Sequence, residues 1–257
     1  MVDKTIVLTC GDNYIYIHPY DGRSALVVDP RDASIVLRAL EAQGLTLTTV
    51  LVTHHHADHT AGVTELKSRT GCEVVGPDRR RIQGIDRIVA DGDVLTLATR
   101  EITVLATPGH TRTSVCYRMA PVTTDEPDIV WTGDTLFVGG CGRPMECEAS
   151  VLWRSLTQLA TLPDDTLVYC GHDYAVENYA FALTIEPNNQ VARERLRDVA
   201  RTAAQGRASV PSTIARERAT NVFMRAGETA IKAALKMNDA EPDRVFAELR
   251  RRKNLFG

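Results

Sequence analysis

The chain has 257 residues, of which 44% are hydrophobic and 25% are charged, and its formal net charge is -3. This length allows one large core, or a main domain with a smaller appendage. The charge gives no general attraction to nucleic acid or to an anionic membrane, and no apolar run approaches the roughly 18 residues that span a bilayer. The segment 1–5 is not typical of a signal peptide, so we expect a cytoplasmic protein. We also expect a monomer that binds neither nucleic acid nor membrane.

Short β-branched runs predict strands along the first two thirds of the chain. The first three strands are expected at 5–9, 14–18 and 25–28, separated by turns rich in glycine and aspartate. A helix is expected over 32–43, because apolar residues recur there at helical spacing and Gly44 follows. An apolar strand at 48–52 then leads directly into an unusual cluster of histidines.

The cluster reads Thr-His-His-His-Ala-Asp-His-Thr and occupies residues 53–60. If the strand continues through it, alternation directs His54 and His56 to one face and His55 to the other. Asp58 and His59 follow after the chain has turned, so they can approach the same space from another side. The cluster therefore predicts a metal site.

Later strands end in the same way. The runs 101–106, 128–131 and 167–170 each lead to a turn that carries His110, Asp134 or His172. Five of the seven histidines thus follow strands beside Gly, Pro or Asp, whereas we interpret His18 and His55 as ordinary side chains. Imidazole and carboxylate ligands suit zinc, iron or manganese.

The candidate ligands are too many for one catalytic ion that keeps an open position, so they indicate two ions. We assign His54, His56 and His110 to the first ion, Asp58, His59 and His172 to the second, and Asp134 to both as a bridge. A water held between ions about 3.5–4 Å apart loses a proton near neutral pH, so the predicted site is built for hydrolysis. Asp58 would also orient this nucleophile.

Asp29, in the sequence Val-Val-Asp-Pro, is a candidate for a carboxylate that supports a histidine ligand from behind. A simple turn-forming role fits Asp29 equally well.

Helical periodicity replaces strands after residue 173. An amphipathic helix is expected over 191–204 and a last helix over about 242–253, with a loop at 206–211. The sequence therefore predicts an α/β domain of residues 1–173, followed by a small helical domain of residues 174–257.

Four motifs resemble the metallo-β-lactamase superfamily. They are T-H-x-H-x-D-H at 53–59, P-G-H-T at 108–111, T-G-D-T-L-F at 132–137 and G-H-D-Y at 171–174. The resemblance implies an αββα sandwich, here with a small C-terminal α-helical domain. Within the superfamily the chain is similar to the glyoxalase II (hydroxyacylglutathione hydrolase) family, through the loop 134–143, the helix that starts at His172, and the segments 211–214, 219–225 and 250–253.

This resemblance implies a binuclear metal-dependent thioester hydrolase. Its expected reaction cleaves S-D-lactoylglutathione, an S-2-hydroxyacylglutathione, to glutathione and D-lactate in methylglyoxal detoxification, with two divalent ions that are zinc, or else iron or manganese. The resemblance also implies that glutathione is contacted by Arg143, Tyr174, Arg250 and Lys253. For 250–253, the residues alone fit a solvated helix end equally well. One departure is Met145, where the family usually has an aromatic residue.

Three alternative functions make different demands on the sequence. A persulfide dioxygenase-like iron oxidoreductase resembles the first domain, including G-C-G-R at 140–143, but that family uses one ion and ends soon after its counterpart of His172. A metal-dependent nuclease would need a track of basic and aromatic residues, which the sequence does not show. A non-catalytic relative would be expected to lack ligands, and none is missing.

Overall fold

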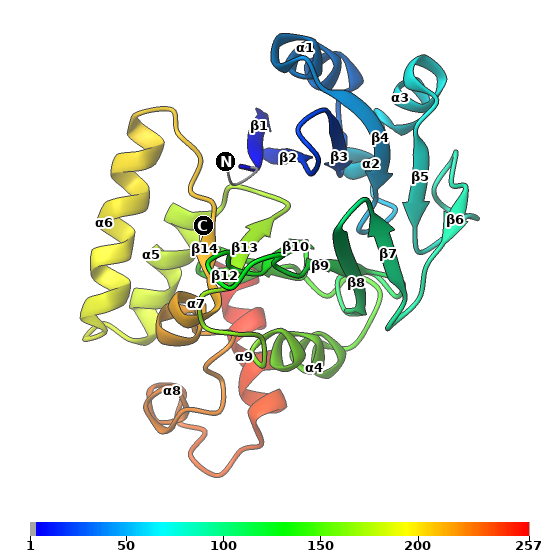
Figure 1. Ribbon diagram of the computed structural model, residues 1–257. Coiled ribbons are helices and arrows are strands. Elements are labelled where there is room, and N and C mark those ends of the chain that lie inside the picture. The colour runs from blue at the N-terminus through cyan, green and yellow to red at the C-terminus, as the bar shows by residue number, and fades with distance from the viewer. Residues whose placement is uncertain (1–3, 257) are drawn as a thin grey trace. The chain divides into compact units, whose positions relative to one another are not determined.

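The computed structural model describes residues 4–256 (Figure 1). The chain forms two compact units, the first made of residues 1–106 and 113–133 and the second of residues 107–112 and 134–257. Among the residues described, no helix is both long and apolar enough to cross a membrane.

The first unit contains a sheet with strand order β1-β2-β3-β4-β5-β6. Its strands are β1 (Ile6–Cys10), β2 (Asn13–Pro19), β3 (Ser24–Val28), β4 (Thr46–Leu51), β5 (Glu73–Gly76) and β6 (Arg87–Ile88). The first three strands pair antiparallel, and β3 to β6 pair parallel. Parallel pairing requires crossover connections, and helices supply two of them: α1 (Ala33–Gln43) between β3 and β4, and α3 (Val63–Thr70) between β4 and β5.

Both faces of the central strands of this sheet are buried. Ile15 and Ile17 of β2 join a core cluster with Val36 of α1 and Leu66 of α3, which lie on the same side of the sheet (Figure 1). Tyr14 and Tyr16 point to the opposite face, because side chains alternate along a strand, and they are buried as well. The first unit therefore needs a second layer on that face.

A second, antiparallel set of strands supplies this layer. It comprises β7 (Val94–Leu97), β8 (Arg100–Ala106), β9 (Val115–Met119) and β10 (Ile129–Gly133). The Tyr117 hydroxyl of β9 donates to the Val52 carbonyl at 2.8 Å, and the Trp131 ring of β10 meets the His18 ring of β2 edge to face at 5.6 Å. The bond to Val52 fixes the backbone directly after β4, where the histidine cluster begins.

The second unit is mainly helical. It contains the hairpin of β11 (Leu136–Phe137) and β12 (Gly140–Cys141), the antiparallel pair of β13 (Leu167–Cys170) and β14 (Ser212–Thr213), and the helices α4 (Ala149–Leu159), α5 (Ala175–Ile185), α6 (Gln190–Ala204), α7 (Ile214–Thr220), α8 (Thr229–Leu235) and α9 (Pro242–Asn254). Its core is aromatic, since Phe223 contacts both Phe181 and Phe246, with ring centroids 5.8 and 5.9 Å apart. The strands and helices expected from the sequence are confirmed, with ends that differ by a few residues.

Candidate metal centre and substrate cavity

The first unit contributes the histidine cluster, which Asp29 anchors. The Asp29 carboxylate accepts from the Thr53 amide at 2.8 Å and from the Thr53 hydroxyl at 2.6 Å. It also lies 2.9 Å from His59 Nδ1. Because an ionised carboxylate only accepts, the proton of His59 belongs on Nδ1, and the Nε2 lone pair is left for a metal. The structure thus places Asp29 behind a predicted ligand, as the sequence suggested.

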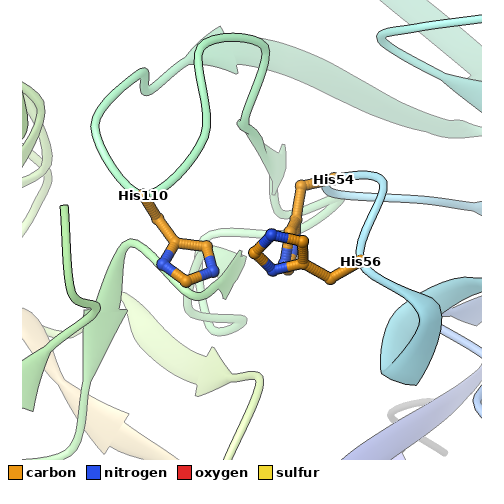
Figure 2. A group of neighbouring side chains, drawn as sticks. All are labelled: His54, His56 and His110. Atoms are coloured by element: carbon orange, nitrogen blue, oxygen red, sulfur yellow. The ribbon is translucent and has the colours of Figure 1, made fainter. Parts of the chain in front are cut away.

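Thr53 connects Asp29 to His54 through hydrogen bonds. Its hydroxyl donates to Asp29, so it can accept from His54 Nδ1, which lies 3.0 Å away. His54 Nε2 then faces His56 Nδ1 at 3.1 Å (Figure 2). Two ligand nitrogens of one tetrahedral zinc ion would be roughly 3.3 Å apart for Zn–N bonds of about 2.05 Å. The separation of the two imidazoles therefore fits a shared ion.

Asp58 is held from the side of β2. The Asn13 side-chain amide donates to both the carboxylate and the carbonyl oxygen of Asp58, each at 3.1 Å. Arg31 donates to Asn13 Oδ1, and since a guanidinium has no acceptor, this bond fixes which end of the amide faces Asp58. The Asp58 carboxylate lies 3.6 Å from His59 Nε2. Asn13 and Arg31 were not found from the sequence.

The second unit contributes His110, Asp134 and His172. One carboxylate oxygen of Asp134 lies 3.4 Å from His110 Nε2 and 3.3 Å from His172 Nε2. His110 Nδ1 donates to the Arg143 carbonyl at 2.8 Å, which again leaves Nε2 for a metal. His110 itself belongs to the loop after β8 (Figure 2). Each unit therefore presents buried imidazole nitrogens together with a carboxylate, a donor set that suits a borderline divalent ion.

Close backbone packing brings Asp134 into position. A Cβ on Gly142 would lie 1.8 Å from the Asp134 carbonyl oxygen, so only glycine fits there. The His172 ring stacks on Tyr174 with centroids 5.1 Å apart and an angle of 4° between the planes. These contacts restrict the orientation of the predicted ligands in the second unit.

The four predicted substrate residues line one cavity of about 390 Å³ in the second unit. Its walls are Phe137, Cys141, Arg143, Tyr174, Glu177, Asn178, Arg250, Lys253, Asn254 and Phe256. The sequence missed Glu177 and Asn178, although they follow Tyr174 at the three- and four-residue spacing that shares a helix face. Met145 is 61% exposed and is not part of the wall.

The cations of this cavity differ in their surroundings. Arg143 is exposed, whereas Arg250 is only 7% exposed. Arg250 donates to the Cys141 carbonyl at 3.0 Å and to the Asn254 side chain at 2.8 Å. Lys253 forms an ion pair with Glu177.

Cys141 also belongs to the cavity wall, where burial raises the pKa of its thiol to about 11. The thiol is therefore protonated at neutral pH and is a weak nucleophile. His18 is likewise excluded from the chemistry of the site. It is buried against Thr5 and Trp131, and burial lowers its pKa to about 4.

Comparisons with known proteins agree with this arrangement. Residues 9–172 match the metallo-beta-lactamase superfamily, and residues 173–256 match the hydroxyacylglutathione hydrolase C-terminus. A hydroxyacylglutathione hydrolase of Brucella ovis is 42% identical over 248 residues, which are 95% of each chain. The crystal structure of ETHE1 from Myxococcus xanthus is 30% identical with a TM-score of 0.64 and covers 100% of both chains. A metallo-beta-lactamase from Staphylococcus aureus covers 98% of this chain and 72% of its own, with a TM-score of 0.65 and 21% identity, and so supports the fold alone.

The fold and the histidine and aspartate groups define a metal-binding enzyme of the metallo-beta-lactamase type. With a relative 42% identical over nearly its whole length, the chain belongs to the hydroxyacylglutathione hydrolase family of that superfamily. The fold class and the family expected from the sequence are both confirmed.

Proposed function

We propose that the chain is a thioester hydrolase that cleaves S-D-lactoylglutathione, or another S-2-hydroxyacylglutathione, to glutathione and the 2-hydroxy acid. In methylglyoxal detoxification this reaction releases D-lactate. One observation supports the proposal most strongly. A chain of the hydroxyacylglutathione hydrolase family has both the full set of candidate metal ligands, imidazole and carboxylate, and a basic cavity. A cytoplasmic location and a monomeric state stay predictions.

The proposed centre holds two divalent ions, zinc or else iron or manganese. His54, His56 and His110 would hold the first, Asp58, His59 and His172 the second, and Asp134 both. Bound ions would polarise the thioester carbonyl and lower the pKa of a water so that hydroxide forms near neutral pH. The number of donors supports two ions, because one catalytic ion needs only three protein ligands and an open position.

The side chains around these ligands prepare them for this role. Asp29 and the Arg143 carbonyl keep protons on the Nδ1 atoms of His59 and His110. Asn13 holds the Asp58 carboxylate, which we propose orients the nucleophile besides binding metal. Because ring orientation and proton position are set in advance, little reorganisation is needed during the reaction.

The cavity of the second unit fits the glutathione part of the substrate. Glutathione brings two carboxylates, and Arg143 and Lys253 present positive charge to the cavity, with Tyr174 as an aromatic partner. A guanidinium can bind a carboxylate through two parallel hydrogen bonds. We propose that residues 1–173 supply the chemistry and that residues 174–257 bind glutathione together with Arg143; the two matched family models meet between residues 172 and 173.

The test follows thiol release from S-D-lactoylglutathione, with acetylthiocholine as a thioester that lacks glutathione. We expect turnover of the first and little of the second. Lys253→Ala should raise KM with kcat near that of the parent. Arg197→Ala, on the exposed side of α6 away from the cavity, is the matched control. Turnover of both thioesters at equal kcat/KM would contradict glutathione recognition.

An iron oxidoreductase is the second candidate and predicts a different outcome. It would bind one ion per chain and consume oxygen with glutathione persulfide. Metal analysis and an oxygen electrode separate the two candidates. The relatives favour the hydrolase, since the Brucella ovis hydrolase is 42% identical and ETHE1 is 30% identical.

A further inference from the structure

The hairpin of β11 and β12 connects the metal side of the second unit to its cavity. It begins two residues after Asp134 and ends two residues before Arg143, and Phe137 and Cys141 are part of the cavity wall. Its strands have two residues each, paired as Leu136 with Cys141 and Phe137 with Gly140. A ladder this short is too small to be stable alone, because even a longer isolated hairpin is marginal in water.

Side chains from distant helices bind the backbone of this hairpin. Asn221 donates to the Phe137 carbonyl at 3.4 Å and to the Gly140 carbonyl at 2.8 Å. Asn178 of α5 donates to the Val138 carbonyl at 3.1 Å. Arg250 of α9 donates to the Cys141 carbonyl, as described above. These bonds hold four of the five carbonyls from Phe137 to Cys141 with side chains from three separate parts of the chain.

Glu217 of α7 lies at the centre of this network. It is fully buried, and its Oε2 atom accepts from the Gly139 amide at 2.8 Å and from Asn221 Nδ2 at 3.0 Å. Both groups can only donate. Its other oxygen accepts from the Ser212 hydroxyl. Without Glu217, the Gly139 amide would lose its hydrogen-bond acceptor, and Asn221 Nδ2 would lose one of its acceptors.

The hairpin itself is shaped for these contacts. Gly139 has a φ of 68°, in the left-handed region that favours glycine. A Cβ on Gly140 would lie 2.4 Å from Asn178 Nδ2, so a side chain at this position would displace the Asn178 side chain that donates to the Val138 carbonyl. The glycines of the hairpin thus leave room for the side chains that bind its backbone.

We propose that Glu217 is a positioning residue for substrate binding: through Gly139 and Asn221 it sets the conformation of the hairpin that carries Phe137 and Cys141 and leads to Arg143. The role requires an acceptor at Oε2 and does not require a charge. Burial raises the pKa of Glu217, and a protonated Oε1 could donate to Ser212, whose hydroxyl also accepts. Glutamine offers the same pattern, with its carbonyl toward Gly139 and its NH₂ toward Ser212.

Two variants of similar size test this inference, which rests on the proposed function for its kinetic part. Glu217→Gln keeps the acceptor, whereas Glu217→Met fills the space without one. For Glu217→Met we expect KM for S-D-lactoylglutathione to rise roughly 10-fold, the effect of losing one buried acceptor, with kcat within about 2-fold of the parent. Glu217→Gln should restore a KM close to the parent value.

Hydrogen–deuterium exchange of the peptide 136–143, measured without substrate, tests the hairpin separately. Faster exchange in Glu217→Met than in Glu217→Gln, with equal metal content, supports the proposal. Equal exchange and equal KM in the two variants would overturn it, as would a loss of kcat at unchanged KM. Failure of the parent protein to release thiol would instead refute the proposed function, and the exchange result would still decide the role of Glu217. If Glu217→Met fails to fold, the comparison passes to Asn221→Leu, which removes the donor to Phe137 and Gly140.

Discussion

Asp29→Asn tests whether the carboxylate behind the histidines controls metal binding. Asparagine is nearly the same size as aspartate, and it tolerates the φ of 51° that residue 29 adopts. Its carbonyl must face the Thr53 amide, which only donates, so its NH₂ group takes the place of the oxygen beside His59 Nδ1. His59 then has to accept at Nδ1, and its proton moves to Nε2, where it blocks the metal.

The direction of the hydrogen bond to His54 also reverses, because the Thr53 hydroxyl lies between Asp29 and His54 Nδ1. Loss of such a supporting partner typically weakens metal binding by about 10–100-fold, equivalent to roughly 1.4–2.7 kcal/mol. We expect Asp29→Asn to lose metal to a chelator at a concentration lower by this factor, while its circular dichroism stays that of the parent.

Competition with a chromophoric chelator measures this effect directly. Asp32→Asn is the matched control, because Asp32 caps α1 and asparagine is an equally good N-cap. If Asp29→Asn and the parent lose metal at the same chelator concentration, Asp29 only shapes its turn and our account of the histidine protons is refuted.

Four further changes have defined outcomes. Removing metal with a chelator should abolish thiol release, and added zinc should restore it. Asn13→Ala, which removes the hydrogen bond from Asn13 to the Asp58 carboxylate, should lower kcat about 10-fold with KM almost unchanged, as stopped assays of thiol release can show. Arg250→Ala should raise KM and also lower the free energy of unfolding in urea by about 1–3 kcal/mol, because it leaves the Cys141 carbonyl buried without this donor. Lys253→Ala should lower that free energy by less, because its partner Glu177 is 52% exposed and can be solvated. Burial raises the pKa of Cys141 from 9.0 to about 11, so folding favours the protonated thiol. The contribution of this thiol to the free energy of unfolding should be constant below pH 9 and fall as the pH approaches 11. Cys141→Ser should reduce this fall.

The candidate metal ligands His54, His56, His110, Asp134 and His172 could be singled out because each lies shortly after the end of a strand, and a turn after an apolar run is visible in the sequence without any tertiary information. The alternation argument for His54 and His56 assumed that the strand continues, whereas β4 ends at Leu51 and the two rings meet in the loop beyond it. Asp58 and His59 lie in the short helix α2 (Ala57–Thr60). The strands and the helical periodicity after residue 173 indicated an α/β part followed by a helical part, whereas the αββα sandwich was inferred from the family resemblance of the motifs.

The supporting residues could not be predicted in this way. Asn13 bonds to Asp58 at a separation of 45 residues, and Glu217 bonds to Gly139 at a separation of 78. A single polar residue carries no periodic signal, so nothing in the local sequence shows whether it is buried or which backbone group it will meet. The position of Glu217 in a helix only seven residues long adds to this difficulty.

The ion pair of Lys253 and Glu177 has a consequence for affinity. An anion that reaches Lys253 must displace a carboxylate that belongs to the protein, so the net gain is the difference between two attractions. The Glu177 side chain is 52% exposed and can turn to solvent, whereas the Lys253 side chain is only 10% exposed and keeps a need for a negative partner. An anion at this position therefore has to replace Glu177 fully, which a ligand with several points of attachment can do more easily than a small monovalent anion.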